Sequence, residues 1–181
     1  MKRSLLFVVL LVLVFSGSAN AYFKGPWKGK VIDAETKQPI EGAGVVAVWY
    51  VTHPGPGDSP ASYLDAEEAV TDKDGNFEIS SKFFFTIPNI RYIESGYPQI
   101  TIFKPGYGSY PRYASSPRGY IKDNYFLDKV GVVELPKITD EKKRYESFVA
   151  AGAGEVPISK KTNYQKLLDI EWEYFHQKVS K

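Results

Sequence analysis

Short runs rich in apolar residues, several with a period of two, recur along the chain and are typical of β-strands. The clearest lie at residues 28–33, 45–51, 99–103 and 130–135. The run at 45–51 is apolar at every position, which predicts a central strand that is covered on both faces. Because Gly, Pro and Asp residues divide the runs, the pattern predicts a mainly β sandwich or barrel.

A β-hairpin is predicted around residues 72–75, which read Asp-Lys-Asp-Gly. Strand-like segments at 66–71 and 76–80 flank this turn, and Asp-Gly supplies the positive φ angle that a tight turn needs. We interpret both aspartates as turn residues. A calcium loop would require an acidic residue in place of Val70 and a glutamate in place of Ser81.

The C-terminal part of the chain changes to a helical pattern. A first helix is predicted over residues 139–149 with Thr139 as N-cap, and the Pro-broken segment 150–161 is predicted to be a linker or an extended arm. A second helix is expected to begin at Thr162, which forms a capping box with Gln165. Its apolar stripe either packs on the sheets or docks on a partner. The stripe consists of Leu168, Trp172 and Phe175.

The N-terminus has the pattern of an export signal. Lys2 and Arg3 precede an apolar run at residues 5–15, and an Ala-x-Ala site ends at Ala21. We expect cleavage after Ala21, with the mature protein in the periplasm or outside the cell. The alternative is a membrane anchor. As a helix the run would be about 16 Å long, roughly half of a ~30 Å hydrocarbon core.

Composition narrows the possible functions. The chain has 23 Lys and Arg against 21 Asp and Glu, and two of the basic residues belong to the signal. The mature protein is therefore essentially neutral, which gives no electrostatic reason to expect nucleic-acid binding, since that requires a basic face. The absence of cysteine excludes thiolate catalysis and cysteine-ligated zinc. An export signal on a chain that has no cysteine to form disulfides is the pattern expected of a bacterial envelope protein.

Three motifs resemble those of the carboxypeptidase regulatory-like family over about residues 27–107. The first runs from Gly29 to Val45, the second is Val-Thr-Asp with Gly75 and Phe77 at 70–77, and the third is Ile-x-Lys-x-Gly-Tyr at 102–107. The first contains these positions: Gly29, Val31, Asp33, Thr36, Pro39, Ile40, Gly42, Ala43 and Val45. The resemblance implies a single antiparallel Greek-key β-sandwich like that of transthyretin, with a C-terminal helical tail.

The expected organisation follows from these segments. Residues 1–21 form the signal, 22–136 the regulatory-like domain with an aromatic-rich loop at 104–125, and 137–181 the helical tail. Residues 53–65 make a longer loop than the family pattern, and 81–96 is an apparent insertion that contains three consecutive phenylalanines.

The supply of catalytic residues argues against an enzyme. The two histidines, His53 and His176, stand alone, whereas metallocarboxypeptidases need closely spaced histidine and glutamate ligands. Transthyretin-like hydrolases rely on several histidines. Intradiol dioxygenases, which share a similar sandwich, need two histidines close together, and this chain has no such pair. We therefore expect no metal, no cofactor and no catalytic residues.

Tyrosines gather between residues 92 and 125, interleaved with Gly, Pro, Ser and Arg. This composition is typical of a contact surface, although the tyrosines could instead cap the end of the sandwich. The candidate binding residues are Tyr107, Tyr110, Arg112, Tyr113, Arg118 and Tyr120. The function predicted is a non-catalytic binding or scaffolding module of the bacterial envelope that recognises a protein or a polysaccharide. The alternatives are an extracytoplasmic hydrolase with an unfamiliar site and a self-assembling structural subunit.

Overall fold

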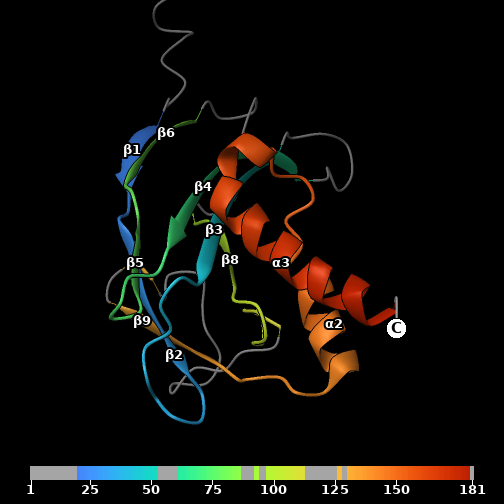
Figure 1. Ribbon diagram of the computed structural model, residues 1–181. Coiled ribbons are helices and arrows are strands. Elements are labelled where there is room, and N and C mark those ends of the chain that lie inside the picture. Colours follow the sequence, from blue (N-terminus) through green and yellow to red (C-terminus); the bar gives the residue numbers. More distant parts are fainter. Residues whose placement is uncertain are drawn as a thin grey trace, which may run out of the picture.

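The described part of the chain combines three β-sheets with two α-helices, which lie together on one side of the strands (Figure 1). The computed structural model of the 181-residue chain describes residues 20–52, 61–86, 92–93, 97–112, 126–127 and 130–179. The strands are β1 (Asn20–Lys24), β2 (Trp27–Asp33), β3 (Gly44–Thr52), β4 (Ser62–Val70), β5 (Asn76–Ile79), β6 (Lys82–Thr86), β7 (Tyr92–Ile93), β8 (Gln99–Phe103) and β9 (Gly131–Leu135). They are followed by α2 (Glu141–Ala150), the 3₁₀ helix η1 (Ile158–Lys160) and α3 (Thr162–Val179).

The strands pair around β2 and β3. Strand β3 pairs with β4 along one edge and with β7 and β8 along the other. Strand β2 lies between β5 and β9, and β1 pairs with β6 alone among the described strands. The β2–β9 pair is parallel, which corrects the expectation of antiparallel strands throughout. A parallel pair is possible here because β2 and β9 are far apart in the chain, with β3 to β8 between them, and parallel strands need a long connection.

The main hydrophobic core lies between the β3 sheet and the β2 sheet. Val45, Ala47 and Trp49 contribute alternate positions of β3, and Trp27 and Val31 contribute alternate positions of β2. The indoles of Trp27 and Trp49 pack edge to face, with 5.3 Å between their ring centroids. Buried aromatic pairs of this kind add to the hydrophobic free energy and here join the two sheets.

The second face of β3 is covered by α3, as Figure 1 shows. Val46 and Val48 are buried on this face together with Tyr164 and Leu168 of the helix. The helix approaches so closely that a Cβ atom at Gly44 would lie 2.8 Å from the Tyr164 ring. The prediction of a strand covered on both faces is therefore confirmed. The apolar stripe of this helix was expected either to pack on the sheets or to dock on a partner. The N-terminal half of the helix packs on the sheet.

The N-terminus of α3 is capped from a distant strand and not by its own residues. The Glu68 carboxylate on β4 accepts hydrogen bonds from the backbone N–H groups of Asn163 (2.9 Å) and Tyr164 (3.0 Å). The predicted capping box is wrong, because the Thr162 hydroxyl donates to Ile158 and the Gln165 amide donates to Asp169. An anionic side chain at this position also interacts favourably with the helix dipole.

The other helix begins one residue later than predicted. Asp140, and not Thr139, is the N-cap of α2, and its carboxylate accepts a hydrogen bond from the Lys143 N–H at 2.8 Å. Asp and Thr are both good N-cap residues, so sequence alone did not separate them.

The segment 150–161, which was predicted to be a linker or an extended arm, is packed against the rest of the protein. Ala151 and Val156 are buried in the same cluster as the helix. The Tyr164 hydroxyl donates a hydrogen bond to the Ala151 carbonyl at 2.7 Å. The Lys161 ammonium donates to the Ala153 carbonyl at 2.5 Å, and burial lowers the pKa of this lysine. This segment and the N-terminal half of α3 thus hold the tail against the sheets.

The predicted hairpin of β4 and β5 is wrong, although its turn forms as expected. Gly75 has a φ of 76°, and its N–H donates to the Asp72 carbonyl at 2.9 Å. The two strands then pair with different partners, β4 with β3 and β5 with β2. The turn therefore connects the two sheets.

Strands β1 and β6 form a two-stranded arm, seen at the upper left of Figure 1, that extends the β2–β5 ladder. Lys24 lies opposite Lys82 and Trp27 lies opposite Ile79, so the register is the same on both sides of a short interruption. The interruption falls at Pro26, which has no N–H group for a ladder. The apparent insertion at 81–96 thus contains β6, which pairs with β1, and β7, which pairs with β3.

Candidate functional site

The first of the predicted binding residues, Tyr107, is half-buried and contacts Asp33 at the end of β2. Its hydroxyl donates to the Asp33 carboxylate, which also accepts the N–H groups of Glu35 and Thr36 at 2.8 Å. These hydrogen bonds, with that from the Thr36 amide the largest, hold the pKa of Asp33 below its ordinary value. Burial and the neighbouring Asp33 raise the pKa of Tyr107. Through this hydrogen bond Tyr107 holds its loop against the end of β2.

Tyr110 also belongs to the core side of the loop. Its ring packs edge to face on Phe126, with 5.9 Å between ring centroids, and it lies against the main core. Of the two alternatives for the tyrosines, a contact surface or a cap on the core, the second describes Tyr110. Arg112 is exposed. The remaining candidates lie outside the described residues: Tyr113, Arg118 and Tyr120.

A groove with a different lining lies between β4 and β6. It has a volume of about 390 Å³. Its lining consists of Trp49, Leu64, Asp65, Lys82, Phe83, Phe84 and Phe85. Phe83 and Phe85 are exposed to 56% and 49%, which is high for phenylalanine in a small domain. Aromatic and charged side chains thus converge here from three strands.

The charged side of the groove is an ion-pair network. The Lys82 ammonium lies 2.6 Å from Asp65 Oδ2 and 3.8 Å from Glu67 Oε2, and the Lys160 ammonium lies 3.0 Å from Asp65 Oδ1. Burial acts to raise the pKa of Asp65, but the hydrogen bonds from Lys82 and Lys160 outweigh it and lower that pKa. The same contact with Asp65 raises the pKa of Lys160. The network is therefore charged at neutral pH.

Trp49 lines the groove through its buried indole, on which Lys82 lies. Its side chain is fully buried, and its Nε1 has no hydrogen-bond partner among the described residues. The Lys82 ammonium lies 4.4 Å from the centroid of the indole, a cation–π distance. An indole N–H in such a position normally finds a partner.

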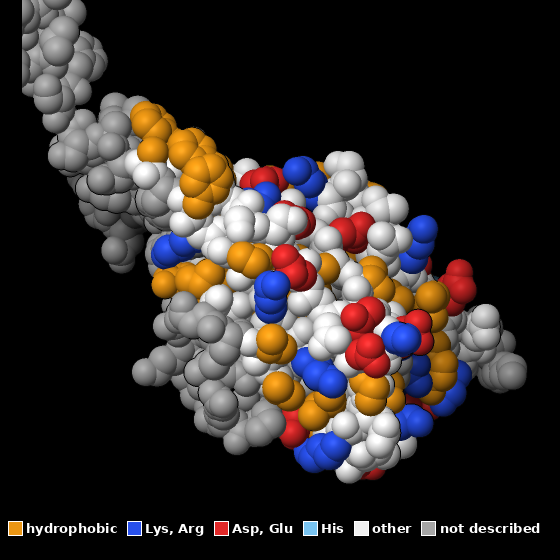
Figure 2. Space-filling model, turned by 90° about the vertical axis from the view of Figure 1, so that its left-hand side faces the viewer, with side chains coloured by type: hydrophobic (Ala, Val, Ile, Leu, Met, Phe, Trp, Pro, Cys, Tyr) orange, Lys and Arg blue, Asp and Glu red, His pale blue; other side chains and the backbone are white. Residues whose placement is uncertain are grey.

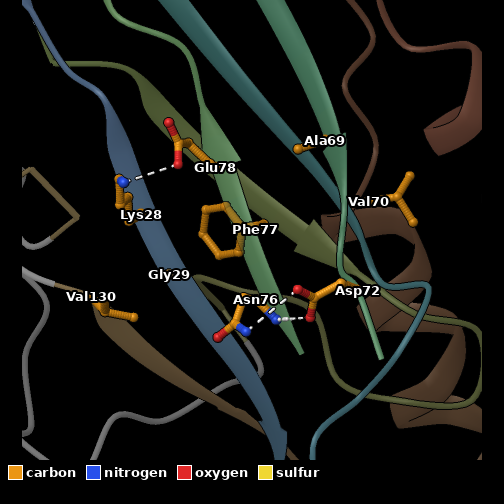
Figure 3. A pocket seen from close by; sticks show the side chains of 9 residues that line it. All are labelled: Lys28, Gly29, Ala69, Val70, Asp72, Asn76, Phe77, Glu78 and Val130. Carbon is orange, nitrogen blue, oxygen red and sulfur yellow. Dashed lines mark hydrogen bonds and ion pairs between the residues drawn. The ribbon is translucent and has the colours of Figure 1, made fainter. Parts of the chain in front are cut away.

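A second groove of about 390 Å³, shown in Figure 3, lies beside the turn between β4 and β5. Its polar rim is already satisfied, because Lys28 pairs with Glu78 at 3.0 Å and Asp72 accepts the Asn76 N–H at 2.8 Å. The Phe77 ring lies over Gly29, where a Cβ atom would approach it to 2.3 Å. The polar side chains of this rim are paired with one another above an apolar floor, so we place the candidate site at the β4–β6 groove, where an ion-pair network lies beside aromatic side chains.

The described residues offer little for metal or acid–base chemistry. Within these ranges no three His, Asp or Glu side chains lie close enough together to hold a metal ion. Glu67 and Glu68 point to opposite faces of β4, since Glu67 accepts the Ser80 N–H and Glu68 caps α3. None of the helices in the described ranges is long and apolar enough to cross a membrane.

The groove was missed at the level of sequence, although the Phe-Phe-Phe run at 83–85 was visible. Which of these rings turn outward depends on strand pairing, and the sequence pattern indicated only that Trp49 is a core residue.

Comparisons with protein-family models, curated proteins and solved structures found no match for this chain.

Proposed function

We propose that this protein is a non-catalytic binding module of the bacterial cell envelope that holds a protein or polysaccharide component in the β4–β6 groove. The observation that carries the proposal is the Lys82–Asp65 ion pair in a groove whose apolar lining includes Leu64 and Phe84. Sugar hydroxyls and peptide groups can both exchange hydrogen bonds with such a pair, and both a sugar ring and a peptide side chain can pack on the apolar lining.

The proposal includes the finer description of the fold. We infer that the two sheets form a Greek-key β-sandwich of the carboxypeptidase regulatory-like type. The order and spacing of the three family motifs support this, as does the core that β2 and β3 share. Such modules mostly bind or brace other components.

Export is part of the same proposal and gives one prediction. The protein purified from cells that express the whole chain should begin at Tyr22, because the Ala-x-Ala site ends at Ala21. The arm would keep three of its five strand pairs, Tyr22–Phe84, Phe23–Phe83 and Lys24–Lys82. N-terminal sequencing of the processed protein measures this directly. Recovery of the intact apolar run would contradict it.

Binding in the groove is tested with Lys82→Met and Asp65→Asn, which change two partly exposed residues of its lining. Each removes one charged hydrogen-bonding group and retains most of the side-chain volume, so we expect about a tenfold loss of partner recovery for each, in line with hydrogen bonds worth about 1–2 kcal/mol. The measurement is quantitative recovery of bound envelope protein and of purified cell-wall polysaccharide, in separate arms.

Lys37→Met is the matched control, since Lys37 forms a comparable ion pair with Glu134 (2.9 Å) on another part of the surface. Thermal melts establish that all three variants are folded. Equal recovery of both partner classes by the wild type, the two groove variants and the control would refute the groove as the binding site.

A further inference from the structure

The outward face of the β1–β6 arm is a second surface without a structural role in the described fold. Phe23, Phe83 and Phe85 are exposed to 74%, 56% and 49%. Phe23 lies opposite Phe83, with 5.1 Å between ring centroids, and Ala21 lies opposite Phe85. Figure 2 shows an orange group at the upper end of the molecule, at the height of the arm.

The register explains why these rings face outward. In β2 and β5 the odd-numbered residues Trp27 and Ile79 point into the core, whereas in β6 the even-numbered Phe84 is buried. In the β2–β5 ladder the odd-numbered residues face the core, whereas beyond the interruption, in the arm, the odd-numbered residues face outward. Since side chains alternate along a strand, Phe23 and Phe83 are then turned away from the core.

The outward face carries no charge and no hydrogen-bonding side chain. Its positions are occupied by Ala21, Phe23, Phe83 and Phe85. The arm's lysines lie on the opposite face, where the Lys24 ammonium is 3.6 Å from the centroid of the Tyr97 ring and Lys82 pairs with Asp65. A polysaccharide would find no partner here for its hydroxyls, so the face suits an apolar partner.

The area of the outward face distinguishes between two apolar partners, a second copy of the protein and a lipid bilayer. With about 150–250 Å² of surface on each aromatic side chain, the three rings expose roughly 350 Å². Two copies meeting through this face would bury roughly 700 Å² in total, less than the ~1,200 Å² at which stable interfaces begin. A bilayer needs no matching surface and accepts an aromatic face of this size at its interface.

The position of the arm in the chain, close to the predicted export signal, also favours a lipid bilayer as the partner. The apolar run at 5–15 ends four residues before β1 begins at Asn20, and five residue steps span at most about 18 Å. While that run is in the membrane during export, the arm is held at the bilayer surface. Cleavage after Ala21 leaves Phe23, Phe83 and Phe85 in the mature chain.

We propose that the outward face of the arm is a membrane-contact site, which places the rings of Phe23, Phe83 and Phe85 in the interface of a lipid bilayer. The contact is peripheral and reversible, and it goes beyond the proposed binding in the groove. It would hold the groove close to the membrane surface.

The test is co-sedimentation of the processed protein with vesicles of phosphatidylethanolamine and phosphatidylglycerol in a 3:1 ratio. Phe23→Ser should lower the partition coefficient at least about fivefold, and Phe23→Ser combined with Phe83→Ser more than about twentyfold. Phe23 does not line the groove, so the single variant should retain partner recovery. Ile158→Ser, which changes an apolar side chain exposed to 66% elsewhere, should bind vesicles like the wild type.

Sedimentation should persist at 0.5 M salt, because the contact is apolar and charge attraction would be screened. The proposal is overturned if the wild type does not sediment, if Phe23→Ser sediments equally, or if high salt releases the protein. It is also overturned if Phe23→Ser abolishes a dimer or the recovery of a partner protein while vesicle binding is unchanged. Loss of partner recovery in the groove variants alone bears only on the proposed function.

Discussion

Replacement of Tyr164 by alanine is expected to remove about 3–5 kcal/mol of folding stability, as large-to-small changes of buried aromatic residues do. Tyr164 is fully buried between α3 and the sheet, where it meets Phe103 edge to face at 6.4 Å between ring centroids. The change would open a cavity against Val46 and Val48. Urea denaturation followed by circular dichroism measures the loss, which should appear in a single transition for strands and helices.

Two control variants sharpen this expectation. Tyr164→Phe keeps the ring but leaves the Ala151 carbonyl without its donor, so it should cost about 1–2 kcal/mol. Tyr145→Ala on α2 changes a tyrosine that is 47% exposed and should cost about 1 kcal/mol or less. If Tyr164→Ala melted only the helices and left the sheets at their original stability, the tail would be a separate appendage.

The strands that sequence predicted best are those whose pattern depends on the strand alone. Residues 99–103 were predicted with the bounds of β8, and the continuous apolar run at 45–51 correctly indicated burial of β3 on both faces. The apolar positions of the second helix likewise placed Leu168 against the protein. In each case a local period and the amount of apolar surface are sufficient, because the hydrophobic effect requires that surface to be covered.

The features that sequence did not predict depend on distant residues. The turn at 72–75 was recognised, but the choice of partner strands for β4 and β5 is made by the two sheets. The cap of α3 comes from Glu68, 95 residues before Asn163, whereas a capping box uses only local residues. The N-terminal N–H groups of α3 are therefore bound by the distant Glu68 carboxylate and not by the local capping box.

The candidate site shows the same limit. Composition drew attention to Tyr107 and Tyr110, yet hydrogen bonding to Asp33 and packing on Phe126 give both of them local structural roles. Composition counts residues and does not report which side of a loop faces the core. Phe83 becomes conspicuous only when the register of the arm with β1 is known.

The second large effect is expected at the ion pair that joins the two helices. The Arg144 guanidinium binds the Glu171 carboxylate through two hydrogen bonds, Nε to Oε1 at 2.5 Å and Nη2 to Oε2 at 2.8 Å. The Glu171 side chain is 1% exposed and that of Arg144 is 18% exposed. The hydrogen bond to Glu171 is the main reason that the pKa of Arg144 is raised, so the guanidinium stays charged.

Because the two partners differ in burial, their single replacements should differ in cost. Arg144→Met leaves a buried carboxylate without a counter-charge and should destabilise by about 3–5 kcal/mol. Glu171→Leu should cost less, since Arg144 still reaches water and lies 3.6 Å from the centroid of the Tyr174 ring. The double replacement should be more stable than Arg144→Met alone, because no isolated charge remains buried. Denaturation of the three variants forms a double-mutant cycle, and additive losses would show that the pair contributes no coupling between α2 and α3.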